Sequence, residues 1–125
     1  MNEVDKLRQA RNILLTLHKS LLDLERAEHE REHGKLNAGQ FLSLILEDQK
    51  FAWLRKFSML IVEIDEMFDL KDGISGEMVL ANLAKVSELV EMREDDETFR
   101  AKYRAALQND VDSAASHARL QALLG

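Results

Sequence analysis

The sequence predicts an all-α protein, and three observations support this prediction. Its 125 residues include no proline, the residue that most strongly disrupts helix interiors. Apolar residues recur at steps of three and four, which is the spacing of one helix face. No run of β-branched or aromatic residues alternates strictly with polar ones, as in a half-buried strand. We therefore predict one domain, residues 1–125, folded as an antiparallel up-down bundle of four long helices plus one short connecting helix.

The first long helix is expected to run from Asn2 to about His33. Its apolar stripe consists of Leu7, Ala10, Leu14, Leu17, Leu21 and Leu24. At 1.5 Å per residue this helix would be roughly 45 Å long, which is long for so small a protein. Gly34 is expected to end it in the left-handed αL conformation.

Capping residues and an acidic turn mark the later helix starts: Asn37, Asp48, Ser75 and the acidic run Glu94–Glu97. The helix after Asn37 is short. The helix after Asp48 is expected to span residues 49–70, and the last helix is expected to continue unbroken to Gly125. The connections between these helices are short, so consecutive long helices should lie antiparallel.

The charge balance is acidic, with 23 Asp and Glu against 17 Lys and Arg and a formal net charge of −6. Nucleic acids and anionic membranes attract clustered basic residues, so neither is expected as a partner. The absence of cysteine excludes disulfides, thiolate metal sites and a cysteine nucleophile. The charged N-terminal residues lack the apolar core of a signal peptide, and no apolar run is long enough to span a bilayer. We therefore expect a cytoplasmic location.

The segment from His29 to His33 matches the pattern H-E-x-x-H, in which two histidines one helical turn apart bind zinc. Glu30 and His33 also match half of a di-iron carboxylate site, although no second copy occurs in the chain. A divalent metal, zinc or iron, is thus one interpretation of His29, Glu30 and His33. The alternative is a solvated, salt-bridged helix end.

A second group of polar residues falls on faces that are otherwise apolar. On a helical wheel His18, Glu25 and His29 lie within about 40° of one another, on the leucine stripe of the first helix. Estimated heights along the helices bring further polar residues near this level. The predicted ligand-binding layer is His18, Glu25, Asp65, Asp110 and His117. The alternative is a polar layer that only fixes the register of the helices.

The helix predicted after Asp48 carries a second apolar strip on its other side, formed by Phe51, Met59 and Val62. Exposed apolar strips mark interfaces. The first functional hypothesis is therefore a non-enzymatic helical bundle that binds another protein or forms a homodimer through this strip. The alternative is a metal- or small-ligand-binding bundle. No cofactor is predicted beyond the metal named above, and no catalytic residue is assigned.

Several segments also resemble those of a known group of proteins. They are Leu24-Glu25-Arg26, Glu30-x-x-His33-Gly34, Phe51-Ala52-Trp53-Leu54-Arg55, Leu60-Ile61-Val62-Glu63-Ile64-Asp65-Glu66 and Tyr103-x-x-Ala106-Leu107-Gln108, with Val111 and His117. In these segments the chain resembles a family of small uncharacterised bacterial all-helical proteins. The resemblance implies a single bacterial cytoplasmic domain. It implies no activity, cofactor or partner, and no functional residue follows from it.

Overall fold

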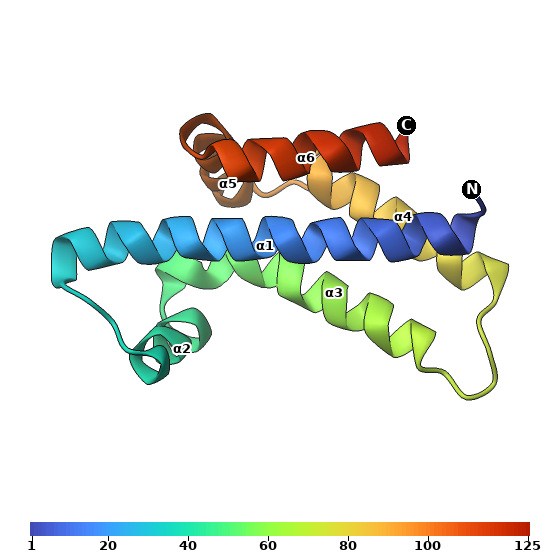
Figure 1. Ribbon diagram of the computed structural model, residues 1–125, viewed down its shortest axis with the longest axis horizontal. Coiled ribbons are helices and arrows are strands. Elements are labelled where there is room, and N and C mark those ends of the chain that lie inside the picture. The colour runs from blue at the N-terminus through green and yellow to red at the C-terminus, as the bar shows by residue number, and fades with distance from the viewer.

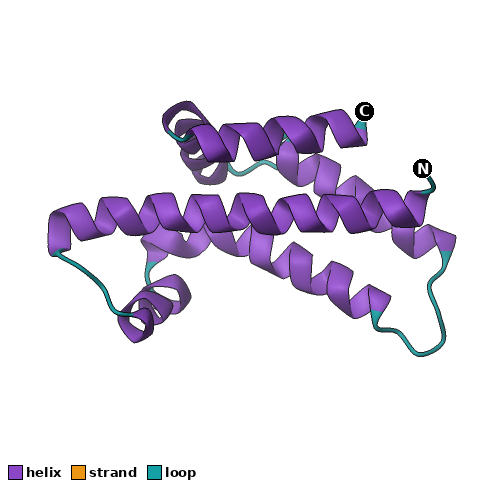
Figure 2. Cartoon of the chain, viewed as in Figure 1, coloured by secondary structure: helices purple, strands orange, loops and turns teal.

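The computed structural model describes residues 1–125, and it is all-α with no strands (Figures 1 and 2). It contains six α-helices and one 3₁₀ helix: α1 (Glu3–His33), α2 (Ala38–Glu47), η1 (Gln49–Leu54), α3 (Arg55–Phe68), α4 (Gly76–Val90), α5 (Glu97–Asn109) and α6 (Val111–Leu124). The predicted all-α class is confirmed. None of the helices is both long enough and apolar enough to cross a membrane.

Helix α1 runs along the whole length of the molecule, as Figure 1 shows. It packs against α3, α4 and α6, and in Figure 1 α3 lies below α1, α6 lies above it and α4 passes behind it. Its predicted start is confirmed, because the side chain of Asn2 accepts a hydrogen bond from the backbone N–H of Asp5 at 2.8 Å. Gly34 follows the helix with φ 86° and ψ 170°. Its φ is positive as predicted, but its ψ is extended rather than αL.

The leucine stripe of α1 forms the centre of the hydrophobic core. Leu7, Leu14, Leu17 and Leu21 are fully buried, whereas Leu24 is only partly buried. Helices η1, α3, α4 and α6 pack against α1. Burying one such leucine is worth about 1.5–3 kcal/mol, so the stripe is the main apolar surface holding the helices together.

Four aromatic side chains join η1, α3 and α5 on one side of this core. They are Trp53, Phe57, Phe99 and Tyr103, and neighbouring ring centroids lie 5.3–6.4 Å apart. Most of these pairs are tilted or edge-to-face, the geometries that aromatic quadrupoles favour. The cluster therefore connects α5 to the middle of the chain.

The helix predicted over residues 49–70 is divided in the structure. Its first six residues form the 3₁₀ helix η1, and α3 ends at Phe68. Residues three apart are eclipsed in a 3₁₀ helix, so Phe51 points the same way as Leu54, into the core. Phe51 is 0% exposed, and its assignment to an exposed interface strip was wrong.

The last predicted helix is also divided, at Asp110. Asp110 has extended backbone angles, φ −132° and ψ 113°, and it caps α6. Its Oδ2 accepts hydrogen bonds from the backbone N–H of Ser113 at 3.1 Å and from the Ser113 hydroxyl at 2.6 Å. In Figure 1 α5 is seen almost end-on, whereas α6 runs along α1. The prediction of one continuous last helix was therefore wrong, and the predicted bundle of four long helices is not confirmed.

The cap at Asp110 should be a measurable part of the stability of the fold. Asp110→Ala removes both hydrogen bonds to Ser113, and we expect it to lower the free energy of unfolding by about 1–2 kcal/mol. Asp110→Asn retains a capping oxygen and should lose less than half of that amount. Urea unfolding followed by circular dichroism measures both. Equal losses in the two variants would contradict the capping role.

Candidate functional site

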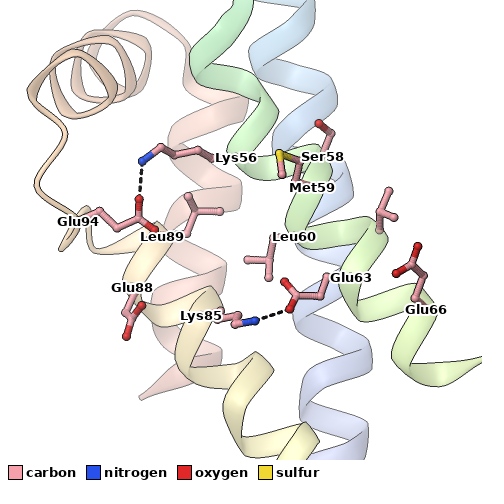
Figure 3. Close-up of a pocket in the computed structure, with 11 residues that line it drawn as sticks. Lys56, Ser58, Met59, Leu60, Glu63, Glu66, Lys85, Glu88, Leu89 and Glu94 are labelled. Atoms are coloured by element: carbon pink, nitrogen blue, oxygen red, sulfur yellow. Dashed lines mark hydrogen bonds and ion pairs between the residues drawn. The ribbon is translucent and has the colours of Figure 1, made fainter. Parts of the chain in front are cut away.

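A broad groove between α3 and α4 is a candidate site. Its volume is about 690 Å³. Figure 3 shows its lining residues: Lys56, Ser58, Met59, Leu60, Val62, Glu63, Glu66, Lys85, Glu88, Leu89 and Glu94. The two helices contact each other along their inner faces, so the groove lies on the outer side of that contact.

The groove has a buried apolar floor and an exposed apolar rim. Leu60 and Leu89 are buried between the helices. Met59 and Val62 are 70% and 53% exposed, although α3 buries five other apolar residues on its opposite face. Two of the three residues predicted to form an exposed strip are thus exposed, one helical step apart on α3.

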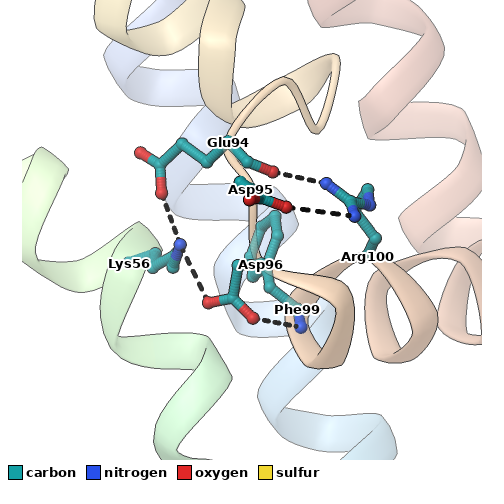
Figure 4. A network of polar contacts seen from close by, with 6 residues as sticks. All are labelled: Lys56, Glu94, Asp95, Asp96, Phe99 and Arg100. Atoms are coloured by element: carbon teal, nitrogen blue, oxygen red, sulfur yellow. Dashed lines mark hydrogen bonds and ion pairs between the residues drawn. The ribbon is translucent and has the colours of Figure 1, made fainter.

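Ion pairs hold charged side chains in place at both ends of the groove. Lys85 on α4 pairs with Glu63 on α3. Lys56 pairs with Glu94 and, at 3.1 Å, with Asp96, as Figure 4 shows. Burial alone would lower the pKa of Lys56, but hydrogen bonds to these two carboxylates outweigh burial and raise that pKa.

The loop that precedes α5 closes the end of the groove at which Lys56 lies. Asp96 caps α5 by accepting the backbone N–H of Phe99 at 3.0 Å, and this bond, followed by the contact with Lys56, lowers the pKa of Asp96. Arg100 donates to the carbonyl oxygen of Glu94 at 2.6 Å (Figure 4). The acidic run was predicted as a turn and a helix start, and α5 begins there.

The charges of the groove do not balance. Four glutamates and two lysines line it, so its formal charge is 2 − 4 = −2. Both lysines are engaged by carboxylates. Glu66 and Glu88 are exposed and make no ion pair, as their separate positions in Figure 3 also indicate. The groove therefore presents two uncompensated carboxylates next to an apolar strip.

The predicted ligand-binding layer is not assembled as one cluster. Asp65 makes two hydrogen bonds with Arg11, of 2.8 and 2.9 Å, and this contact lowers the pKa of Asp65. His18 lies against the ring of Phe57 with a centroid distance of 6.4 Å. Asp110 caps α6. These residues therefore have separate structural contacts.

Glu25 is buried, as its position on the leucine stripe indicated, and it is 8% exposed. Its Oε2 and the Nε1 of Trp53 are both buried without a hydrogen-bond partner. Burial is the largest influence on Glu25 and raises its pKa above the ordinary value of 4.5, while the nearby charge of Lys102 opposes that shift only in part. The surroundings of Glu25 therefore disfavour its charged form.

His117 makes the one histidine hydrogen bond inside the fold. Its Nδ1 lies 2.7 Å from the hydroxyl of Tyr103, which is fully buried. Burial lowers the pKa of His117 and raises that of Tyr103, so it favours the neutral form of both side chains. The bond joins α5 to α6.

The H-E-x-x-H segment ends α1 on the surface. The rings of His29 and His33 are 4.6 Å apart. Glu30 turns away from them, because its Oε2 accepts the backbone N–H of Leu36 at 2.8 Å and lies 3.6 Å from Arg26. Nowhere do three or more histidine, aspartate or glutamate side chains lie close enough together to hold a metal ion. The metal site remains a prediction from the sequence alone.

Sequence reasoning missed most of the residues that line the groove. Glu63 and Glu66 follow Met59 and Val62 by one helical turn, so the sequence carried a signal for acidic residues beside the apolar strip. The two lysines of the groove, Lys56 and Lys85, pair with carboxylates that are 22 to 40 positions away in the sequence. No local pattern predicts such pairs.

Comparison with protein-family models, with curated proteins and with solved structures found no match. The resemblance to bacterial helical proteins therefore remains a prediction. The functional argument depends on the geometry of the chain itself.

Removing the charge of Glu25 should stabilise the protein. We expect Glu25→Gln to raise the melting temperature by a few degrees at pH 7, because burial disfavours the charged carboxylate and its Oε2 has no hydrogen-bond partner. A carboxyl whose pKa is raised by folding stabilises the fold below its unfolded pKa, and this stability is lost as the pH rises through the folded pKa. The difference between variant and wild type should therefore shrink towards pH 4.5. A Glu25→Gln protein less stable than wild type at pH 7 would contradict this assignment.

Acidification should weaken the fold through its half-buried histidines. Burial lowers the pKa of His18 and His117, so their neutral forms stabilise the fold above the ordinary value of 6.5, and that stability is lost as the pH falls through the folded pKa. Urea unfolding between about pH 7 and about pH 5 should give a shallower decline in His18→Gln and in His117→Gln than in wild type. The double variant should have the shallowest decline. If the stability of all three variants fell as steeply with pH as that of wild type, the histidines would not be the cause of the decline.

Proposed function

We propose that the protein is a non-enzymatic binding module that acts through protein–protein interaction. The contact surface is the α3–α4 face, defined as Met59, Val62, Glu63, Glu66, Lys85 and Glu88. The exposure of Met59 and Val62 on the outer side of a helix that buries its other apolar face is the observation that carries the proposal. The partner is a second copy of the chain or another protein.

The energetics of burial support this proposal. Covering an exposed methionine or valine side chain contributes about 1.5–3 kcal/mol, and two such residues one helical step apart can anchor one partner segment. Met59 and Val62 do not belong to the buried core. Contact with another protein surface would give these exposed apolar side chains a role.

The chemistry of the groove favours binding over catalysis. Its two lysines are ion-paired, and it contains no histidine. The hydroxyl of Ser58 donates to the carbonyl oxygen of Arg55 at 3.2 Å, so it has no adjacent base. A nucleophile needs such a base or a lowered pKa. The alternative function, a metal- or small-ligand site on α1, has in its favour a groove of about 740 Å³ beside His29, but no three metal-ligating side chains gather there.

Site-specific crosslinking tests the proposed function. A photoreactive amino acid at position 59 should give crosslinked products in cells that express the chain, because Met59 would lie inside an interface. The same amino acid at position 111 should give none, although Val111 is 84% exposed. Light scattering over a range of concentrations then distinguishes a second copy from another partner. The absence of position-specific products, together with a monomer at all concentrations, would overturn the proposal.

A stability measurement provides the control for this experiment. Met59→Lys and Val62→Lys change exposed positions, so each should alter the free energy of unfolding by less than about 0.5 kcal/mol. Loss of crosslinking from position 59 in a background that carries Val62→Lys would then reflect a lost contact and not a lost fold. A larger loss of stability would show that this strip belongs to the core.

A further inference from the structure

We propose that the occupant of the α3–α4 face is a basic amphipathic helix from another protein. This inference rests on the proposed function and adds the chemistry of the partner. Its apolar side would cover Met59 and Val62, and its lysine or arginine side chains would lie opposite Glu66 and Glu88.

The charge distribution points to a basic partner. Both lysines of the groove are already paired with carboxylates, namely with Glu63 and with Glu94 and Asp96. Glu66 and Glu88 have no such partner, and the groove carries a formal charge of −2. A basic side chain placed here gains favourable interactions, whereas an acidic one is repelled. The pairing within the groove thus leaves only negative charge for a ligand.

The same distribution disfavours a second copy of the chain. Another copy would bring an identical acidic face, and each chain carries a formal charge of −6. A two-fold contact places the same patch on both sides, and the one cation of that patch, Lys85, is already paired with Glu63, so Glu66 and Glu88 would meet no free cation. Self-association through this face would therefore work against electrostatic repulsion.

The shape of the face favours a helical segment. Met59, Val62 and Glu66 are spaced at three and four residues, and so they form one ridge along α3. The ridge runs beside a groove whose other wall is α4. A partner helix can lie in such a groove, with apolar anchors at three- and four-residue steps. The chain contains no strand edge that could pair with an extended peptide.

Apolar contact and charge would have different effects on binding. Burial of Met59 and Val62 supplies most of the affinity, because exposed ion pairs contribute little in water. The carboxylates select basic partners and make the association sensitive to salt, since charges on a surface are screened. The two contributions can therefore be measured separately.

The test uses a fluorescein-labelled 18-residue peptide with leucines on one helical face and lysines at the remaining positions. Fluorescence anisotropy with the full chain should give saturable binding that weakens at 500 mM NaCl. Met59→Asp/Val62→Asp should raise Kd at least about tenfold. Glu66→Lys/Glu88→Lys should raise it about three- to tenfold. If the aspartate variant fails to melt cooperatively, Met59→Gln/Val62→Thr replaces it and should still raise Kd.

The control is a double variant with the same change in net charge. Glu47→Lys/Asp72→Lys alters two exposed carboxylates outside the groove, and it should leave Kd within about twofold of wild type. Equal weakening in this control and in Glu66→Lys/Glu88→Lys would mean that only overall charge matters, which overturns the proposal. A peptide with glutamates in place of the lysines should bind at least about tenfold more weakly. Equal binding of the two peptides would also overturn it.

Two further outcomes separate this inference from the proposed function. If light scattering finds a dimer that Met59→Asp/Val62→Asp dissociates, the occupant is a second copy and the basic helix is wrong. If position 59 gives specific crosslinks but the lysine peptide does not bind, the face binds proteins of another chemistry. If neither crosslinks nor peptide binding occur, both proposals fail.

Discussion

Burial of the leucine stripe on α1 is the interaction on which the other helices depend. Leu7, Leu14, Leu17 and Leu21 are completely enclosed, and α3, α4 and α6 all contact α1 around them. Because one long helix supplies a continuous apolar surface, the shorter helices can each bury one face against it without a large core of their own. The aromatic cluster of Trp53, Phe57, Phe99 and Tyr103 extends this core toward α5.

The polar residues near this core have unequal roles. The hydrogen bond between Tyr103 and His117 satisfies a buried hydroxyl and ties α5 to α6. Glu25 instead lies buried without a partner for one oxygen, close to an indole N–H that also lacks one. Burying a carboxyl oxygen without a hydrogen-bond partner costs free energy, so Glu25 at the polar end of the stripe on α1 works against folding. The leucines of the same stripe outweigh this cost.

Helix α3 has two apolar sides with different surroundings. The inner side, which includes Phe57 and Ile64, is buried in the core. The outer side presents Met59 and Val62 beside four glutamates and two engaged lysines. The ion pairs from Lys85 and Lys56 fix the α3–α4 face in position while leaving Glu66 and Glu88 free to meet a partner. A rigid acidic rim around a small apolar strip is suited to selective recognition of basic segments.

Local sequence determined where the helices begin, whereas only the tertiary structure determined where they are interrupted and which residues they contact. Asn2, Asn37 and Ser75 each cap the helix that the sequence assigned to them, because a capping side chain bonds to its own backbone within three residues. The three-residue spacing of Met59 and Val62 was likewise local, and it predicted two exposed residues correctly. The prediction that Phe51 is exposed was wrong because η1 has 3₁₀ geometry, which directs Phe51 into the core. The prediction of one continuous last helix was wrong because the extended backbone at Asp110 separates α5 from α6. The pairing of Asp65 with Arg11, and of the groove lysines with distant glutamates, depends on residues that are far apart in the chain and meet only after packing.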